Sequence, residues 1–321
     1  MSEPFLIGLV GARGHTGREL VRLISEHPEF MLAYAVSREL AGRRVSEIAP
    51  EDKDECIFEA LAPEEAARRR VDAIVLALPD GAGGPYVAAI ERNAPDKIVV
   101  DLSADYRFDD RWEYGLPKLR RLMGEGERIK GATRIANPGC YATALQLAVA
   151  PLVPRLSGPP SIFGVSGYSG AGTTPSPRND ALRLRDNLMP YKLVGHNHER
   201  EATRHLRHPV RFTPHVHPAF RGIVITAHLP LAGSMSAGEV KALYETAYKD
   251  EPLIEIRDEA PELKDGTGIP GVIIGGFAVA ADGGHAVVVA AEDNLLKGAA
   301  VQAVQNLNIA LGLPEFRGLA T

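Results

Sequence analysis

The chain has 321 residues, 45% of them hydrophobic and 24% charged, which is the composition of an ordinary globular protein with room for two domains. Its 36 basic and 41 acidic side chains give a net charge of −5, which offers no basic face for nucleic-acid binding. The sequence shows neither a run of roughly 18 apolar residues nor the basic start and cleavage site of a signal peptide. We therefore expect a cytoplasmic protein with no membrane or nucleic-acid partner.

Short apolar runs alternate with helical patterns in the first half of the chain. Continuous apolar strands separated by helices are typical of a parallel, doubly wound sheet that is buried on both faces. The predicted strands are 5–10, 31–36, 73–78 and 98–102, and a helix is predicted over residues 17–26.

The pattern changes in the second half, where the strand candidates are longer and partly alternating. A mixed or antiparallel sheet fits them better than a further series of parallel strands. The predicted elements are a helix at 141–153, a turn-rich stretch at 158–177, strands at 163–165, 222–231, 272–280 and 285–291, and a helix at 297–311. The fold class is therefore α/β, with a Rossmann-type sheet followed by an α+β domain.

A glycine-rich turn follows the first predicted strand. Gly11, Gly14 and Gly17 form a G-x-x-G-x-x-G turn that enters a helix, where backbone N–H groups and the helix dipole suit a pyrophosphate. The residues between them, Arg13, His15 and Thr16, are the other candidate contacts of a dinucleotide. A tight turn without a ligand is the alternative.

The end of the second predicted strand distinguishes NADP from NAD. NAD sites usually carry an acidic side chain there, whereas this chain has Ser37 and Arg38, a hydroxyl and a guanidinium suited to a 2′-phosphate. A solvated Arg38 without a ligand is the alternative. Leu78 and Pro79 end the third strand and are placed beside the cofactor, which we predict to be NADP(H).

Only two cysteines occur, Cys56 and Cys140, which favours neither a disulfide nor a structural zinc site in a reducing cytosol. Pro138 and Gly139 form a turn that places Cys140 in the first turn of a helix. The helix dipole there stabilises a thiolate, which is the nucleophile needed for acyl transfer. A buried structural cysteine is the alternative.

Several segments, in order along almost the whole chain, resemble the N-acetyl-γ-glutamyl-phosphate reductase family, a relative of aspartate-semialdehyde dehydrogenase. The most specific is Asn-Pro-Gly-Cys-Tyr-Ala-Thr at 137–143. The others are 10–20, 101–107, 166–172, Tyr191 with 196–201, 214–215, 221–222 and 293–298.

The resemblance implies NADPH-dependent reduction of an acyl phosphate through a thioester and a thiohemiacetal on Cys140. It places the acid/base histidine in the segment His196–His198; we favour His198, oriented by Glu201 three residues later, with His196 as the alternative. Arg200 stands where the family usually has proline.

The resemblance also places Arg107 near the substrate, and the glycine-rich loop containing Ser169 and Gly170 offers N–H groups for an anion. Tyr191 is a further candidate substrate contact, and Asn294 is implied to approach the cofactor. A flexible surface loop is the alternative for residues 167–172.

We expect an NADP-binding domain at 1–144, completed by the helix at 293–321, and a catalytic and oligomerisation domain at 145–292. The expected assembly is a homodimer or homotetramer. The expected substrate is N-acetyl-γ-glutamyl phosphate, giving N-acetyl-glutamate 5-semialdehyde and phosphate in arginine biosynthesis.

Three alternatives remain. The substrate could be N-succinylglutamyl, carrier-bound aminoadipyl or aspartyl phosphate. The chain could instead be a non-catalytic, NADP-sensing regulatory protein. A zinc site from His196, His198, His215 and His217 is conceivable, but the reaction needs no metal and we predict none.

Overall fold

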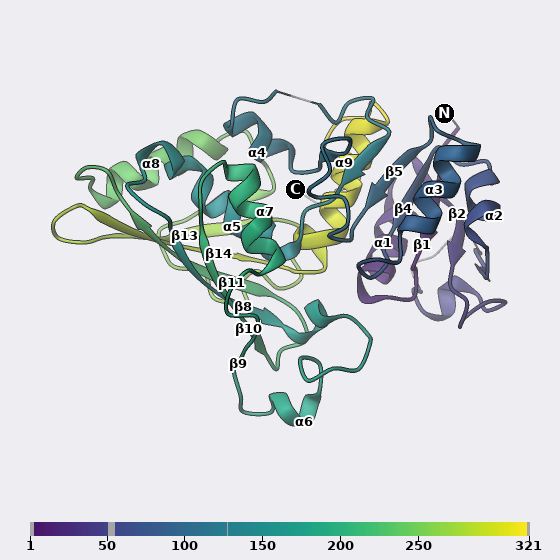
Figure 1. Cartoon of the computed structure of the whole chain (residues 1–321), viewed down its shortest axis with the longest axis horizontal. Coiled ribbons are helices and arrows are strands. Elements are labelled where there is room, and N and C mark those ends of the chain that lie inside the picture. The colour runs from purple at the N-terminus through teal and green to yellow at the C-terminus, as the bar shows by residue number, and fades with distance from the viewer. Residues whose placement is uncertain (1–2, 51–54, 127, 320–321) are drawn as a thin grey trace. The chain divides into compact units, whose positions relative to one another are not determined.

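The computed structural model describes residues 3–50, 55–126 and 128–319. The chain divides into two compact units. The first comprises residues 1–117, 127–138 and 299–320, and the second comprises residues 118–126 and 139–298. Each unit contains one sheet of the fold drawn in Figure 1.

The first unit is built on a seven-stranded sheet in the order β3-β2-β1-β4-β5-β7-β6. Every neighbouring pair is parallel. The strands are β1 (Phe5–Val10), β2 (Phe30–Val36), β3 (Phe58–Glu59), β4 (Ala73–Leu76), β5 (Ile98–Asp101), β6 (Glu113–Tyr114) and β7 (Arg134–Ala136). Strand order reverses between β1 and β4, so a crevice for a ligand is expected at the carboxyl ends of these two strands.

Helices bury both faces of this sheet, since all four residues of β4 are inaccessible to solvent. One core cluster joins Tyr34, Ile74 and Leu76 to side chains of α2 (Pro63–Arg68) and α3 (Gly84–Asn93). The helix α1 (His15–Glu26) packs on β1 and β2, and α9 (Val301–Ala310) packs on α1 and β5. The C-terminal helix is thus part of the first unit.

The second unit contains a mixed seven-stranded sheet in the order β12-β13-β14-β11-β8-β10-β9. The β8·β10 and β12·β13 pairs are parallel, and the other pairs are antiparallel. The strands are β8 (Ser161–Gly167), β9 (Met189–Pro190), β10 (Arg211–His217), β11 (Ile223–Pro230), β12 (Ile254–Ile256), β13 (Val272–Val279) and β14 (His285–Glu292).

The central helix of the second unit is α5 (Cys140–Val149), which packs on β11, β14 and α7 (Asn197–Leu206). Nine of its ten residues are buried; Cys140 alone is partly exposed.

The remaining helical elements of the two units are η1 (Val45–Glu47), α4 (Pro117–Leu122), η2 (Ala150–Arg155), η3 (Tyr168–Ala171), α6 (Ala181–Leu184), α8 (Ala237–Tyr248) and the π-helix η4 (Leu296–Ala300). No helix in the described part of the chain is long and apolar enough to cross a membrane.

The predicted fold class is confirmed, and the first strand has the predicted bounds. The strand predicted at 163–165 is longer than expected and takes up more of the turn-rich stretch at 158–177, because β8 runs from Ser161 to Gly167. The strand β10 was not predicted, because Pro214 interrupts its apolar pattern. Its pairing with β9 is short and involves only His215 and Val216 of β10. The predicted final helix begins as a π-helix at Leu296 before α9 starts at Val301.

Candidate active site

The glycine turn of the first unit lies between β1 and α1, beside the strand-order reversal. Gly11 has a φ of +88°, and a Cβ there would lie 2.2 Å from the carbonyl oxygen of Ala77. A Cβ on Gly17 would lie 2.5 Å from the carbonyl oxygen of Gly11. Only glycine fits at these two positions, so the turn passes as closely as it can to the end of β4.

The N-terminus of α1 is suited to an anion. Its cap residue is Gly14, which makes no side-chain capping bond, and its first turn carries no acidic residue. A Cβ on Gly14 would make only an ordinary contact, 3.5 Å from the carbonyl oxygen of Gly11. Uncapped N–H groups and the positive end of the helix dipole fit a pyrophosphate. The residues present therefore fit a dinucleotide.

The end of β2 carries the residues predicted to select the cofactor. Ser37 is buried and its N–H donates to the carbonyl of Glu59 at 3.0 Å, whereas Arg38 is exposed. The nearest acidic side chain along the chain, Glu39, forms an ion pair with Arg13 at 2.5 Å. This end of β2 therefore presents a hydroxyl and a guanidinium rather than an unpaired carboxylate.

The loops after β4 and β5 are tied to each other. The N–H of Gly81 donates to both carboxylate oxygens of Asp105, at 3.0 and 2.8 Å, and that of Ala104 donates to Asp80 at 2.9 Å. The Leu78 side chain lies 3.3 Å from where a Cβ on Gly11 would be, so the structure brings the predicted Leu78–Pro79 loop to the glycine turn.

Arg107 is buried in the first unit, where its guanidinium donates hydrogen bonds to backbone carbonyls. It is only 7% exposed; its Nε donates to the carbonyl of Asn137 at 2.9 Å and its Nη2 to that of Leu102 at 2.7 Å. Sequence reasoning placed this arginine at the substrate, and these two bonds give it a structural task that the sequence did not reveal.

Cys140 is the first residue of α5, as predicted, and Gly139 is the cap with no side-chain capping bond. The N–H of Gly139 instead donates to Oε1 of Glu201 at 2.9 Å, and Glu201 is completely buried on α7. A carboxylate from a different helix thus holds the residue that precedes the thiol. We had assigned Glu201 to orienting His198, and this contact with the backbone at Gly139 was not foreseen.

The two candidate histidines have different environments. His196 is the N-cap of α7, and its Nδ1 accepts the N–H of His198 at 3.2 Å. Burial, then the charges of Lys192 and Arg178, lower the pKa of His196 to about 4. His196 is therefore a neutral capping residue near neutral pH. His198 lies two residues after His196, in the first turn of α7, and the centroids of the two rings are 4.8 Å apart.

Tyr191 packs against His196 and interacts electrostatically with the Cys140 thiol. Its ring centroid is 5.5 Å from that of His196, and the guanidinium of Arg178 lies 5.1 Å from its centre. Burial raises the pKa of Tyr191, and the charge of Cys140 adds to the effect. The structure therefore brings Cys140, Tyr191 and the His196–His198 segment together in the second unit, with cationic side chains around them.

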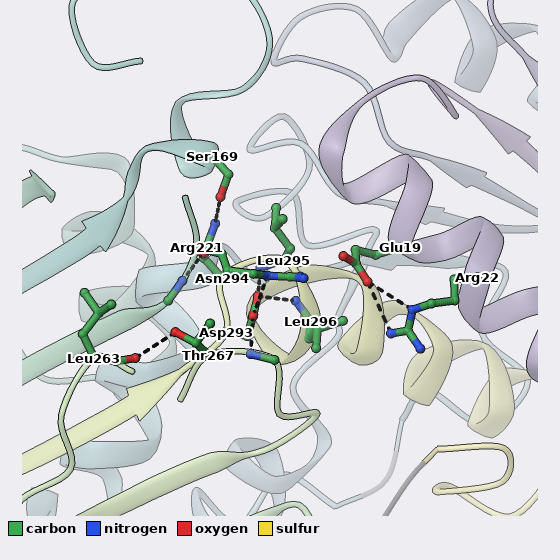
Figure 2. Close-up of polar contacts among 12 residues, drawn as sticks. Glu19, Arg22, Ser169, Arg221, Leu263, Thr267, Asp293, Asn294, Leu295 and Leu296 are labelled. Carbon is green, nitrogen blue, oxygen red and sulfur yellow. Dashed lines mark hydrogen bonds and ion pairs between the residues drawn. The ribbon is translucent and has the colours of Figure 1, made fainter. Parts of the chain in front are cut away.

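The predicted anion loop is tied to the segment after β14. The side-chain amide of Asn294 donates to Oγ of Ser169 at 2.9 Å, and its Oδ1 accepts the N–H of Gly222 at 2.8 Å (Figure 2). A Cβ on Gly170 would lie 3.2 Å from Oγ of Ser166. Asn294 thus fixes two loops of the second unit; a contact with the cofactor remains a prediction.

Arg178, Lys192 and Glu292 were absent from the predicted site. The two cations lie in a stretch without periodicity, and no signal in the sequence ties them to His196. Glu292 ends the apolar run of β14, so the sequence pattern indicated only the end of a strand there.

Among the described residues, no group of three or more His, Cys, Asp or Glu side chains could hold a metal ion, so the four-histidine alternative has no support.

Two family models match the chain. The one described as the semialdehyde dehydrogenase NAD binding domain matches residues 6–123, and the one described as the semialdehyde dehydrogenase dimerisation domain matches residues 140–294. Aspartate semialdehyde dehydrogenase II of Vibrio cholerae, solved as a complex with ASA, has a TM-score of 0.77 over 96% of this chain and 98% of its own, at 15% identity. The enzyme of Candida albicans, solved with NADP, has a TM-score of 0.72 over 96% and 98%, at 17% identity. These structures share the fold.

Curated relatives are much more similar in sequence. The N-acetyl-gamma-glutamyl-phosphate reductase of Xanthomonas campestris pv. campestris (strain 8004) is 53% identical over 99% of both chains. The protein of the same name from Stenotrophomonas maltophilia (strain R551-3) is 52% identical over 99% of this chain and 98% of its own. The one from Xylella fastidiosa (strain 9a5c) is 50% identical over 99% of this chain and 94% of its own. The chain is an oxidoreductase of the semialdehyde dehydrogenase class, and within it the chain belongs to the N-acetyl-γ-glutamyl-phosphate reductase family. The predicted family is confirmed.

Proposed function

We propose that this protein reduces N-acetyl-γ-glutamyl phosphate with NADPH, giving N-acetyl-glutamate 5-semialdehyde and phosphate. The observation that carries the proposal is the position of Cys140, at an uncapped helix start beside Tyr191 and the His196–His198 segment. The relatives at 50–53% identity, named for this reaction, support the choice of substrate.

The thiolate of Cys140 attacks the acyl carbon and displaces phosphate, so a thioester bond forms as the acyl–phosphate bond breaks. When bound, NADPH supplies the hydride that takes the thioester to the thiohemiacetal. The thiohemiacetal then collapses, which releases the semialdehyde and returns the electron pair of the C–S bond to the Cys140 sulfur.

Proton transfer falls to His198 in this proposal. It accepts the thiol proton before attack, donates it to the oxygen as hydride adds to the thioester, and takes it back when the thiohemiacetal collapses. His196 is unsuited to the task, because its Nδ1 is occupied by the cap of α7 and its pKa lies about 4. Arg178 and Lys192 place positive charge in this environment, which favours an anionic acyl phosphate.

The first unit holds NADP(H) in the proposal. The turn from Gly11 to Gly17 takes the pyrophosphate at the start of α1, while Ser37 and Arg38 take the 2′-phosphate at the end of β2. The ion pair that engages Glu39 supports NADP over NAD, since it withdraws the acidic group that a ribose hydroxyl would use. The second unit is then the catalytic and oligomerisation domain of a cytoplasmic homodimer or homotetramer.

Phosphate-dependent reduction of NADP⁺ with N-acetyl-glutamate 5-semialdehyde tests the proposal. We expect turnover that requires phosphate, with kcat/KM for the acetylated substrate at least tenfold above those for succinylated and unmodified semialdehydes. A higher kcat/KM for another substrate would replace the proposed acyl group. NADP⁺ binding by calorimetry without turnover on any of them would instead support the regulatory sensor.

A further inference from the structure

Glu292, the last residue of β14, is completely buried. Within the part of the chain that the structure describes, neither Oε1 nor Oε2 has a hydrogen-bond partner. Buried polar groups are almost always partnered, so a carboxyl left in this state needs an explanation. Neither the fold nor the catalytic proposal above uses this side chain.

The carboxyl group lies close to Cys140, and Gly298 shows how close. A Cβ on Gly298 would lie 2.7 Å from Cβ of Cys140 and 3.0 Å from Oε1 of Glu292. Cβ of Cys140 and Oε1 of Glu292 therefore cannot be further apart than the sum of these two distances. The π-helix η4 carries Gly298 into this position.

The surroundings of Glu292 favour its protonated form. Burial, and then the charge of Asp293, raise the pKa of Glu292 well above its usual range, while the charge of Lys297 opposes them. Asp293 is itself engaged by Arg221 at 2.7 Å and by the N–H of Gly268 at 2.7 Å (Figure 2). The raised pKa favours the neutral carboxylic acid, which has one O–H to donate.

We propose that Glu292 is a positioning residue for Cys140, a neutral acid whose proton stabilises the thiolate and thereby sets the pH at which the thiol ionises. This inference rests on the proposed role of Cys140 as the nucleophile. A neutral acid beside a thiolate can donate a hydrogen bond to it, whereas an ionised carboxylate at the same place would oppose the second negative charge. The two acidic groups then titrate as a coupled pair.

The test measures ionisation of the thiol rather than turnover, so it is independent of the substrate. Alkylation of Cys140 by iodoacetamide is followed by peptide mass spectrometry from pH 5 to pH 10, in a Cys56→Ser background. Glu292→Gln keeps a neutral donor of the same shape, and Glu292→Leu removes the donor. Glu255→Gln, on an exposed position of β12, is the matched control.

We expect the Glu292→Gln and Glu255→Gln proteins to alkylate with the midpoint of the wild type. In the Glu292→Leu protein the midpoint should rise by about one pH unit, which makes alkylation about tenfold slower at pH values well below both midpoints. An unchanged midpoint in Glu292→Leu would overturn the proposal. A midpoint lowered by a unit or more in Glu292→Gln would also overturn it, since Glu292 would then be ionised in the wild type.

Infrared difference spectra of wild type minus Glu292→Gln supply a second measurement that does not depend on the leucine variant folding. A protonated-carboxyl stretch at pH 7 that is lost in Glu292→Gln is expected, and its absence would overturn the proposal. If Cys140 is not the nucleophile, the Cys140→Ser protein retains turnover, while the Cys140 thiol can still be titrated in the Glu292 variants. Failure of the proposed function and failure of the proposed role of Glu292 can therefore be told apart.

Discussion

Glu201 accepts the backbone N–H of Gly139 at 2.9 Å, so a buried carboxylate on α7 fixes the residue that precedes Cys140. Replacing it with alanine leaves that N–H unpaired in the interior, which costs about 1–3 kcal/mol. We expect Glu201→Ala to lower the free energy of unfolding by about this amount and to reduce kcat, and Glu201→Gln to lose less of both. Urea denaturation and steady-state kinetics measure the two effects.

Glu199 provides a control on the same helix, because its Oε2 accepts the N–H of Phe212 at 2.8 Å. We expect Glu199→Ala to lose stability of similar size while the rate of Cys140 alkylation stays within about twofold of the wild type. Equal alkylation rates in Glu199→Ala and Glu201→Ala would contradict the role given to Glu201.

Mutation of the two histidines at the start of α7 should affect kcat differently. His198→Asn removes the proposed acid/base and is expected to reduce kcat by about 10²–10⁴-fold. His196→Asn supplies an equally good helix cap and should keep kcat within about tenfold of the wild type. Steady-state kinetics at pH 7.5 on both variants decides the assignment; a larger loss in His196→Asn would reverse it.

Arg38 should determine the preference for NADP. A guanidinium–phosphate hydrogen bond contributes about 1.5–3 kcal/mol, so Arg38→Ala is expected to raise the Kd for NADP⁺ by about 10–100-fold and to change that for NAD⁺ little. Arg43→Ala is the control, because Arg43 is exposed and paired with Glu47 at 2.8 Å. Equal weakening of both nucleotides, measured by calorimetry, would remove Arg38 from the 2′-phosphate site.

Asp101, at the end of β5, should make stability depend on pH. Burial raises the pKa of this carboxyl to about 6 although Ser103 donates to it at 2.6 Å. Between its unfolded pKa of about 4 and about 6, the folded state binds more protons than the unfolded state, so stability falls as pH rises through this window. We expect the wild type to lose about 2–3 kcal/mol relative to Asp101→Asn between pH 4 and pH 7.

Chemical denaturation of the two proteins at pH 4, 5.5 and 7 measures this difference. A constant difference across the three pH values would show that folding leaves the pKa of Asp101 unchanged. His196 contributes the opposite slope, because its lowered pKa makes the folded state bind fewer protons, and the Asp101→Asn comparison cancels that contribution.

The sequence predicted the parts of the protein that depend on local pattern. The strand at Phe5–Val10, the turn at Gly11–Gly17 and the helix start at Cys140 each follow from neighbouring residues. Contacts between distant segments have no such signal. The bond from Gly139 to Glu201 joins residues 62 apart in the chain, and Arg178 reaches Tyr191 from a loop. These contacts exist only once the second sheet has formed.

The resemblance supplied the histidine segment, in which the sequence favoured His198 over His196. The bond from the N–H of His198 to Nδ1 of His196, which depends on the cap of α7 and has no signal in the sequence, supports that choice. Arg107 shows another limit, because its two hydrogen bonds to backbone carbonyls have no signal in the sequence, while its place at the substrate stays a prediction.

Trapping of the acyl group on Cys140 tests the central claim most directly. With N-acetyl-glutamate 5-semialdehyde, NADP⁺ and no phosphate, the thioester has no phosphate to accept its acyl group. We predict about one NADPH per active site in a rapid burst, and an N-acetylglutamyl mass increase on the peptide that contains Cys140. Cys56→Ser should show both and Cys140→Ser neither. A burst in Cys140→Ser, or acylation of another residue in an active enzyme, would contradict the mechanism.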